Sequence, residues 1–540
     1  MTPESLTRTV QDFLNEASGA VVLEDGAVAF DLAQAKYSIS GEYNKCLLHL
    51  WSAERNTVRR VLDAEVKNGT LRMAVQRLGQ AHPVKLEICR ERDRRSPSAK
   101  RAARVAYEAK LRRAIERHFP GFTLARLTSG VDLEKSFGPI YARGLIRQGQ
   151  TAFAVLGVNA SEMQSSIDAS LTFGILWLDL LRQNPHPSTG SGQAFSQKQG
   201  VGGHPSCLVQ GLILFVPAGS SALVRERMAN LNRAAAKWRL FEFDERQDAV
   251  VEIDCSDRGN IATRLVHATN ETAAVERFAE PIARVQTVLP NCEVAVLSPA
   301  EISFRWRGLE FARARMGAEA ITFQSRQEIV FGVGAEERVL EDRNWAFFVQ
   351  LVTALRDARH PYGPRGERLF RMHPERWLES LACADVSVID ERLEPESVYS
   401  QVPAFSAADR AMIDVLTLTR EGRLAVVELK ADEDIHLPLQ GLDYWARVRW
   451  HHERGEFLKF GYFGGRELSA ELPLLFLVAP ALRVHPSTDT ILRYISPDVH
   501  WAFVGIDERW REGVRVVFRK RSNHGDAEAR RNRDLSAATA

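Results

Sequence analysis

The chain has few of the residues that mark disulfide-stabilised, zinc-binding or membrane-spanning proteins. Its six cysteines lie far apart, with no CxxC pair and no histidine at finger spacing, so neither a disulfide framework nor a zinc site is expected. No apolar run approaches the roughly 18 residues of a membrane span, and the first thirty residues lack a basic segment followed by an apolar one. We therefore expect a cytoplasmic protein with reduced thiols and no membrane partner.

Nucleotide-binding motifs are also missing. The sequence has no GxxxxGK[ST] loop and no kinase or Rossmann fingerprint, so built-in ATP use is not expected, and an ATP-driven step would need a separate partner protein. The formal net charge of +2 averages over an uneven distribution, because eleven Lys or Arg residues and only four acids lie between Arg90 and Arg117. Such a basic stripe suits a phosphate backbone, and an ordinary solvated helix face explains it equally well.

The length and an internal similarity indicate several domains. A chain of 540 residues is too long for one hydrophobic core, so about two to four domains are expected. A shift of 263 residues places "LILFVP" (212–217) on "LFLVAP" (475–480) and "WRLFEFDER" (238–246) on "WAFVGIDER" (501–509). With the segments around them, both parts predict the order strand, helix, strand, helix, strand, strand.

We interpret this similarity as a tandem duplication of a unit of about 260 residues. The predicted fold class is α/β within an α+β multidomain chain, each unit holding a β-rich module and an α/β core with a mixed central sheet. The alternative is two unrelated α/β layers that resemble each other by chance. The predicted segments are a β-rich module with a basic helix (1–120), a first core (121–255) with a flexible loop (182–206), a second β-rich module (256–370), a second core (371–519) and a disordered tail (520–540).

One stretch of the second core predicts a hairpin of unusual composition. "IDVLTLTREGRLAVVELK" (413–430) reads as two apolar strands around the loop "REG". Gly422 is the third loop residue, where a left-handed backbone is wanted. Thr419 then pairs with Arg423, and this pair determines which residues face each other further along the strands.

The predicted register brings charges together inside the strands. Counting outward places Asp414 opposite Glu428, with Lys430 two residues further along the same face. Opposed carboxylates have Cβ atoms only about 5 Å apart and repel each other, so a cation should lie between them. Two carboxylates and a lysine are the groups that metal-assisted phosphodiester hydrolysis needs: the acids hold Mg²⁺ or Mn²⁺, and the ammonium orients water or neutralises developing charge. An ordinary surface ion pair of Glu428 and Lys430 is the alternative.

At these residues the chain resembles the PD-(D/E)xK, or restriction-endonuclease-like, nuclease superfamily. The likeness covers about residues 370–518, and its signature is an acid on one strand followed by Glu or Asp, any residue and Lys on the next. Here the signature reads Asp414 and then Glu428-Leu429-Lys430. The segment before Asp414 departs from the pattern because it contains no literal Pro-Asp.

The following helix extends the resemblance. Gln440 and Tyr444 in "QGLDY" share a helix face and are similar to the Gln-x-x-x-Tyr motif of the RecB-like branch, in which the pair helps to hold substrate. An upstream helix, "HPERWLESL", offers Glu379 or, failing that, Glu375 as a further acid. The resemblance implies catalytic roles for Asp414, Glu428, Lys430, Gln440 and Tyr444, and metal binding by Asp414, Glu428, Leu429 and Glu379.

The first core lacks this motif, because it carries "FAVLGV" (153–158) where the second carries "VVELK". It is expected to be catalytically silent and to serve as a scaffold, a dimer surface or a DNA clamp. The resemblance implies a Mg²⁺-dependent deoxyribonuclease whose N-terminal half binds substrate or partner, in DNA repair, restriction or antiphage defence, with endo or exo action left open. Two alternatives remain: a catalytically silent nucleic-acid-binding protein, and an assembly scaffold that never meets DNA.

Overall fold

The computed structural model shows a mixed α and β chain with four β-sheets in the residues it describes. These are residues 2–522, without 16–19, 25–26, 33–34, 43–44, 52–55, 68–69, 78–82, 91–96, 133–135, 184–207, 259–260, 262, 269–270, 319–324, 335–336 and 407–409. The chain forms two compact units. Unit 1 comprises residues 1–262, 405–411 and 487–496, and unit 2 comprises 263–404, 412–486 and 497–540.

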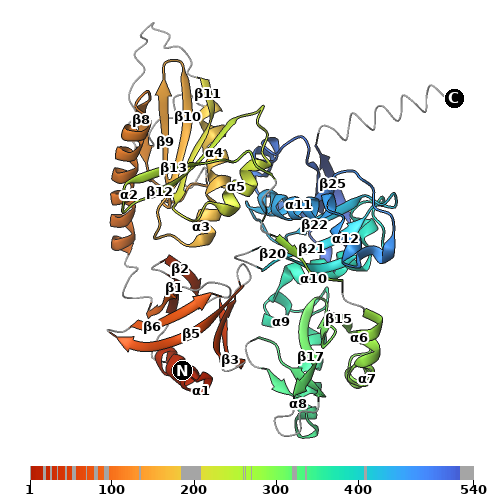
Figure 1. Cartoon of the computed structure of the whole chain (residues 1–540). Coiled ribbons are helices and arrows are strands. Elements are labelled where there is room, and N and C mark those ends of the chain that lie inside the picture. The colour runs from red at the N-terminus through yellow and green to blue at the C-terminus, as the bar shows by residue number, and fades with distance from the viewer. Residues whose placement is uncertain are drawn as a thin grey trace, which may run out of the picture. The chain divides into compact units, whose positions relative to one another are not determined.

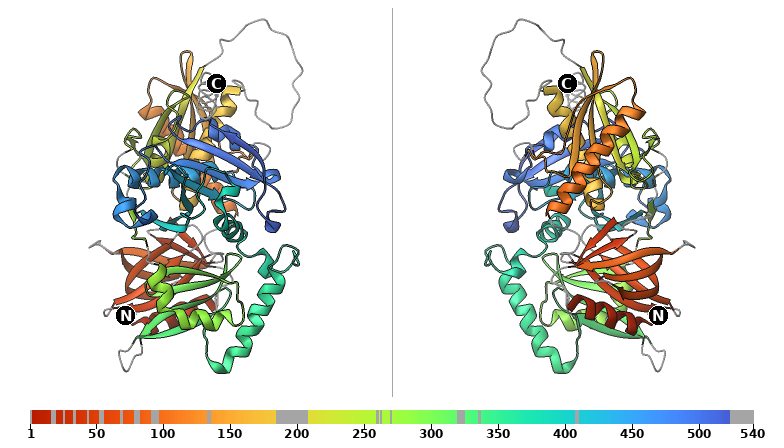
Figure 2. Two further views of the ribbon diagram at one scale, coloured as in Figure 1. Left: turned by 90° about the vertical axis from the view of Figure 1, so that its right-hand side faces the viewer. Right: turned by 90° about the vertical axis from the view of Figure 1, so that its left-hand side faces the viewer.

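Unit 1 begins with an antiparallel sheet covered by one helix (Figure 2, red to orange). The strand order is β2-β1-β7-β6-β5-β4-β3. Leu6, Val10 and Phe13 are spaced to share one side of helix α1, and they pack into the core beneath the sheet. The elements are α1 (Pro3–Asn15), β1 (Ala20–Glu24), β2 (Ala27–Asp31), β3 (Lys36–Glu42), β4 (Lys45–Trp51), β5 (Asn56–Lys67), β6 (Thr70–Arg77) and β7 (Val84–Arg90).

The rest of unit 1 is a mixed sheet with helices on both faces (Figure 1). Its order is β13-β12-β11-β10-β9-β8, with β10, β11 and β12 parallel and the outer pairs antiparallel. Tyr107 of α2 packs with Val155 on one face, while Trp177 of α4 donates a hydrogen bond to the Gly144 carbonyl at 2.7 Å. The elements are α2 (Pro97–His118), β8 (Thr123–Thr128), β9 (Tyr141–Gln148), β10 (Thr151–Val158), α3 (Gln164–Asp168), α4 (Ser170–Gln183), β11 (Leu208–Pro217), α5 (Ala222–Ala229), β12 (Lys237–Asp244) and β13 (Ala249–Ile253).

Unit 2 also contains an antiparallel sheet, with the order β15-β16-β17-β18-β19. Its core is rich in phenylalanine, and Phe304 and Phe311 of the strands pack with Phe348 of helix α8. Aromatic residues of this size dominate the apolar area that such a small sheet can bury. The elements are α6 (Glu271–Arg277), α7 (Ala279–Gln286), β15 (Glu293–Ser298), β16 (Glu301–Trp306), β17 (Leu309–Ala318), β18 (Ser325–Phe331), β19 (Arg338–Val339), α8 (Trp345–Ala358) and α9 (Arg368–Arg371).

The second mixed sheet has the order β14-β20-β21-β22-β23-β24-β25. Strands β22, β23 and β24 are parallel, and the pairs β21–β22 and β24–β25 are antiparallel. Ser487–Ser496, which includes α13, clusters with unit 1. The elements are β14 (Thr263–Leu265), α10 (Pro374–Ala384), β20 (Tyr399–Ser406), β21 (Arg410–Leu418), β22 (Leu424–Leu429), α11 (Leu437–Glu453), α12 (Glu456–Lys459), β23 (Leu474–Pro480), α13 (Thr488–Arg493), β24 (His500–Ile506) and β25 (Val516–Arg521).

The two mixed sheets share one topology. From β8 to β13 and from β20 to β25, the strands follow the same order, with two parallel pairings between the same members. A helix follows β10 and β22, and another follows β11 and β23. The predicted order of elements is therefore confirmed, and the tandem duplication remains our interpretation of it.

The structure differs from the predicted segments at several borders. Thr263–Leu265 forms the edge strand beside β20 instead of belonging to the second β-rich module. Helix α2 packs on the first mixed sheet, because its Tyr107, Leu111 and Ile115 join that sheet's core. Lys520 and Arg521 extend β25 into the expected tail. The predicted flexible loop, apart from the end of α4, and residues 523–540 of the predicted tail lie outside the described residues.

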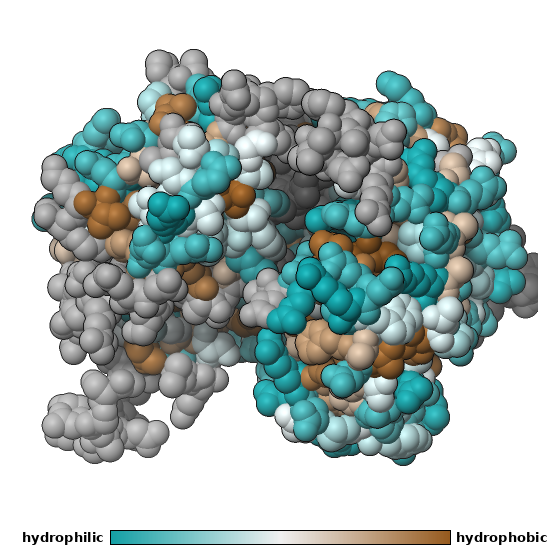
Figure 3. Space-filling model, turned by 90° about the horizontal axis from the view of Figure 1, so that it is seen from below, coloured by the Kyte–Doolittle hydropathy of each residue, from teal (hydrophilic) through white to brown (hydrophobic). Residues whose placement is uncertain are grey.

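Two general expectations from composition can be compared with the structure. The five cysteines in its described part are free, and Cys207 lies outside that part. None of the described helices has both the length and the apolar character needed to cross a membrane. The face in Figure 3 mixes apolar and polar residues, so hydropathy alone does not single out a docking surface there.

Candidate active site

The predicted hairpin forms with the expected three-residue loop. The Thr419 amide donates to the Arg423 carbonyl at 2.7 Å, and the Gly422 amide donates to the Thr419 carbonyl at 2.9 Å. Gly422 has φ +82°, which glycine adopts without a steric cost. Val415 pairs with Val427, so the next pair outward is Asp414 and Glu428, as the sequence predicts.

The two faces of this hairpin have different neighbours. Val415, Val427 and Leu429 pack into an apolar core together with Trp377 of α10. Asp414 and Glu428 alternate with these residues and therefore face the other side, where α11 covers the sheet. Helix α11 comes close because Gly441 has no side chain; a Cβ atom there would lie 2.4 Å from Leu477 Cδ2.

The carboxylates of Asp414 and Glu428 meet as predicted. Each carboxylate lies close enough to perturb the pKa of the other, and Asp414 Oδ2 accepts a hydrogen bond from the Leu429 amide at 3.1 Å. Lys430 Nζ lies 3.6 Å from Glu428 Oε1 and 3.7 Å from Asp434 Oδ2. Glu428 is 2% exposed and Lys430 19%, so this is not a pair on an open surface.

A third acid approaches through a glutamine that the sequence did not indicate. Glu379 on α10 is 5% exposed, and its Oε2 accepts hydrogen bonds from Arg376 Nη1 at 3.0 Å and from Gln401 Nε2 at 2.8 Å. Gln401 Nε2 also lies 3.5 Å from Asp414 Oδ1. Gln401 has φ +53°, a conformation that non-glycine residues rarely adopt and that clusters at functional sites.

Burial makes the protonated forms of these acids favourable. It raises the pKa of Glu428 well above its usual range, and the nearby charge of Asp414 raises it further. Burial also raises the pKa of Asp414, although the Leu429 amide and Lys430 counteract it. Burial raises the pKa of Glu379 to about 7, with Arg376 opposing the shift and Asp414 adding to it.

The cationic and aromatic members of the predicted site lie in the same environment. Burial lowers the pKa of Lys430, but Glu428 and Asp434 more than offset it, so the net shift is upward. Burial and then the charges of Glu428 and Asp414 raise the pKa of Tyr444 well above its usual range. Lys430 therefore stays a cation near neutral pH, and Tyr444 stays a neutral hydroxyl.

The remaining predicted residues are placed as follows. Gln440 lies in the first turns of α11, which begins with Leu437 and Pro438, and its Oε1 is buried without a hydrogen-bond partner. Glu375 acts on the pKa of Lys430 and is therefore nearby. The Leu429 side chain belongs to the apolar core, so only its main-chain carbonyl could contact a metal.

The donor set fits a hard divalent cation. Glu428 Oε2 and Gln440 Oε1 are buried and have no hydrogen-bond partner. Burying an acceptor in this way lowers the stability of the folded protein. A cation would also offset the repulsion between the opposed carboxylates of Asp414 and Glu428. Among the residues that the structure describes, no three His, Cys, Asp or Glu side chains are grouped to hold a metal alone. Mg²⁺ commonly uses one or two carboxylates and keeps several waters.

The corresponding position of the first core carries an arginine. Leu156 pairs with Leu214 on β11, and Glu428 pairs with Leu477 on β23, which the 263-residue shift aligns with Leu214. Leu156 therefore takes the place of Glu428. Its partner on β9 is Arg143, which takes the place of Asp414.

Arg143 is buried among aromatic rings. Its guanidinium lies 4.4 Å from the centre of the Phe137 ring and 5.8 Å from that of Trp177. Burial lowers its pKa to about 10. A buried cation here disfavours binding a second cation, and the catalytic silence of the first core stays a prediction.

Three cations of the basic stripe have acidic partners within their own unit. On α2, Arg104 pairs with Glu162 at 3.0 Å, and Lys110 lies 3.5 Å from Glu245. Arg117 pairs with Asp248 at 2.6 Å. These contacts give the three residues a structural role, and the use of the stripe in DNA binding stays a prediction.

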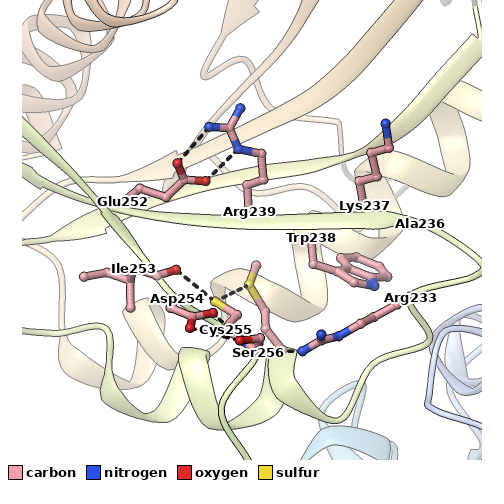
Figure 4. A pocket seen from close by; sticks show the side chains of 11 residues that line it. Arg233, Ala236, Lys237, Trp238, Arg239, Glu252, Ile253, Asp254, Cys255 and Ser256 are labelled. Carbon is pink, nitrogen blue, oxygen red and sulfur yellow. Dashed lines mark hydrogen bonds and ion pairs between the residues drawn. The ribbon is translucent and has the colours of Figure 1, made fainter.

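A pocket of about 540 Å³ lies elsewhere on unit 1 (Figure 4). Its cations already have partners: Arg239 pairs with Glu252 at 2.7 Å, Lys237 donates to Gln210 at 2.8 Å, and Arg233 donates to the Cys255 carbonyl at 3.0 Å. Burial raises the pKa of the Cys255 thiol to about 12, which makes it a poor nucleophile. The pocket therefore supports no specific chemistry.

No protein-family model matches the chain, and neither a curated protein nor a solved structure matches it. The likeness to the nuclease superfamily therefore depends on Asp414, Glu428-x-Lys430 and Gln440-x-x-x-Tyr444. Their positions in the fold are those described above.

Gln401 gives a first testable prediction. Under the nuclease interpretation that the resemblance implies, Gln401→Leu is expected to lower cleavage roughly ten- to a hundredfold, the usual cost of losing a partner that orients a ligand. Since the Gln401 amide stabilises the ionised form of Glu379, its loss raises the pKa of Glu379 and shifts the acid limb of the pH profile upward. Measuring kcat/KM against pH tests this, with the exposed Gln247→Leu as control. A lower rate with an unmoved profile would contradict the role.

Proposed function

We propose that this chain is a Mg²⁺- or Mn²⁺-dependent nuclease that hydrolyses phosphodiester bonds of DNA in its second core. The observation that carries the proposal is the buried pair Asp414 and Glu428, with Lys430 3.6 Å away and Glu379 joined to it through Gln401. This set resembles the PD-(D/E)xK centre in residue type and in strand position.

The burial of these charges favours a functional site over an ordinary ion pair. Burying charged groups costs several kcal/mol each before pairing is counted, and Glu428 retains an orphaned oxygen even so. A surface pair would avoid both costs. Strained and unsatisfied groups gathered at one place are typical of active sites.

Each residue has a distinct role in the proposal. Asp414 and Glu428, with the Leu429 carbonyl, would hold the metal, and Glu379, joined to Asp414 through Gln401, would support them. The metal would supply Lewis-acid activation of the phosphodiester. Lys430 is positioned to orient a water or neutralise the negative charge that develops in the transition state. Gln440 and Tyr444 present an amide and a hydroxyl from α11 to the substrate.

The test of the proposal is cleavage of labelled single- and double-stranded DNA with Mg²⁺, Mn²⁺ or EDTA. Lys430→Met is expected to lower the metal-dependent rate by roughly 10²- to 10³-fold, as expected when one charge-stabilising group is lost. The exposed Lys459→Met, on α12, should cleave like the wild type. A wild type that cleaves no DNA with any metal would refute the proposal.

The alternative is a catalytically silent nucleic-acid-binding or assembly scaffold. The buried Arg143 favours a non-catalytic role for the first core only, with substrate, partner protein or a second copy as its target. A DNA-binding protein should lose affinity steeply with salt, because phosphate contacts release counterions, whereas a protein scaffold should not.

A further inference from the structure

Helix α11 carries a line of polar residues that begins at the candidate active site. Gln440, Tyr444, Arg447 and His451 are spaced by four, three and four residues, which places them on one side of the helix. The line extends about 10 Å along the helix axis from Gln440 to Arg447, at 1.5 Å per residue. The resemblance accounts for Gln440 and Tyr444 but not for Arg447.

Arg447 is buried without the partners that a buried arginine normally has. It is 5% exposed, and its Nε and Nη1 atoms make no hydrogen bond. Other arginines nearby in the chain are engaged: Arg449 of the same helix pairs with Glu453 at 2.7 Å, and Arg454, just after the helix, donates to the Trp450 carbonyl at 3.1 Å. A buried guanidinium with two unpaired donor atoms costs stability, so it indicates an absent anionic partner.

Arg447 belongs to the environment of the active site. It acts electrostatically on Tyr444, which also senses Glu428 and Asp414. The buried atoms without hydrogen-bond partners fall into two groups. The acceptors Glu428 Oε2 and Gln440 Oε1 lie at the start of the line, and the donors Nε and Nη1 of Arg447 lie further along it. Such an order suits a metal at the acceptors and an anion at the donors.

The line ends at His451. Its Nδ1 contacts the Glu456 carboxylate, and its Nε2 lies 3.0 Å from Thr263 Oγ1. Because both ring nitrogens are occupied, His451 has no donor left for a ligand. Arg447 is therefore the last residue of the line that can receive one.

We propose that Arg447 binds a backbone phosphate of the DNA strand, next to the phosphodiester held at the carboxylates. The inference rests on the proposed function and adds a second anchoring point for the substrate. A planar guanidinium donates two parallel hydrogen bonds to phosphate, which fixes the position and direction of the strand. A sequence-independent contact of this kind strengthens binding without selecting bases.

The experiment compares Arg447→Met with Arg449→Met, its neighbour on the same helix. Binding of fluorescein-labelled single-stranded DNA is measured by anisotropy over a salt series in full-length protein that also carries Glu428→Gln. Arg447→Met should weaken binding by roughly tenfold and flatten the slope of log affinity against log salt by about 0.7, the loss of one phosphate contact. Arg449→Met should change neither quantity.

Cleavage and unfolding measurements separate substrate binding from a structural role. In otherwise wild-type protein, Arg447→Met should raise KM more than it lowers kcat, and its unfolding temperature should be unchanged or higher because an unpaired charge is removed. If Arg447→Met does not fold, Arg447→Gln, which keeps amide donors, undergoes the same test. A lower unfolding temperature with unchanged KM would overturn the proposal.

The test distinguishes failure of the inference from failure of the proposed function. A wild type that cleaves DNA, beside an Arg447→Met variant with unchanged KM and salt slope, would refute only the role of Arg447. A wild type that neither binds nor cleaves DNA would refute the nuclease function itself.

Discussion

Glu428→Gln is expected to abolish metal-dependent DNA cleavage while raising the free energy of unfolding of the metal-free protein. The loss of cleavage should be roughly 10³-fold or more, because the substitution removes a metal ligand and the partner of Lys430. The gain in stability has a separate cause. Glu428 is buried opposite Asp414 with one oxygen unpaired, so removing its charge relieves desolvation and repulsion and should contribute about 1–3 kcal/mol.

Urea denaturation near pH 8 measures this gain, in EDTA so that no metal contributes. Glu453→Gln is the matched control, because Glu453 is an exposed carboxylate of α11 whose partner is Arg449. The control should retain cleavage and change stability by less than about 0.5 kcal/mol. A Glu428→Gln variant that is both inactive and less stable would indicate that Glu428 is a structural residue.

Mg²⁺ is expected to stabilise the protein far more at about pH 8 than at about pH 6, because protons compete with it for the same carboxylates. The pKa of Glu379 is about 7, and those of Asp414 and Glu428 are also raised. At the higher pH these acids are closer to ionisation, and a ligand at a hundred times its dissociation constant adds about 2.7 kcal/mol.

The metal-free protein should show the opposite trend with pH. Between about pH 4.5 and 7, unfolded Glu379 has released its proton while the folded side chain keeps it, so the free energy of unfolding falls as pH rises. At about 1.4 kcal/mol per pKa unit, Glu379 alone accounts for roughly 3 kcal/mol over this window.

Thermal unfolding with Mg²⁺ at about pH 6 and 8 tests the first trend, and thermal unfolding in EDTA from about pH 4.5 to 8 tests the second. Glu428→Gln should lose most of the Mg²⁺ effect, whereas Glu453→Gln should keep it. An equal Mg²⁺ effect at the two pH values, or in Glu428→Gln, would show that the metal binds elsewhere in the chain.

Much of the candidate site follows from local sequence rules. The loop residue Gly422 and the two-residue period of a strand were enough to place Asp414 opposite Glu428 and beside Lys430, because hairpin register depends on loop length. Gln440 and Tyr444 follow from helical spacing in the same way. The line could also have been extended to Arg447, which lies three residues after Tyr444.

Other parts of the site have no local signal. Gln401 lies outside every motif, and its approach to Glu379 depends on a left-handed backbone that glutamine seldom adopts. The apolar side of α2 packs on the first mixed sheet. An amphipathic pattern shows that a helix has such a side but does not specify which surface it packs against. The edge strand β14 is too short to be recognised from three residues.

The sequence by itself determined the order of strands and helices, the hairpin register and the residue types of the candidate centre, because each depends on spacing between near neighbours. Only the tertiary structure decided how deeply Asp414, Glu428 and Glu379 are buried, which partners they have, and that Arg143 occupies the matching place in the first core. Burial and electrostatic shifts depend on groups that are distant in the chain. The raised pKa values and orphaned atoms that support the proposals therefore arise only in the folded chain.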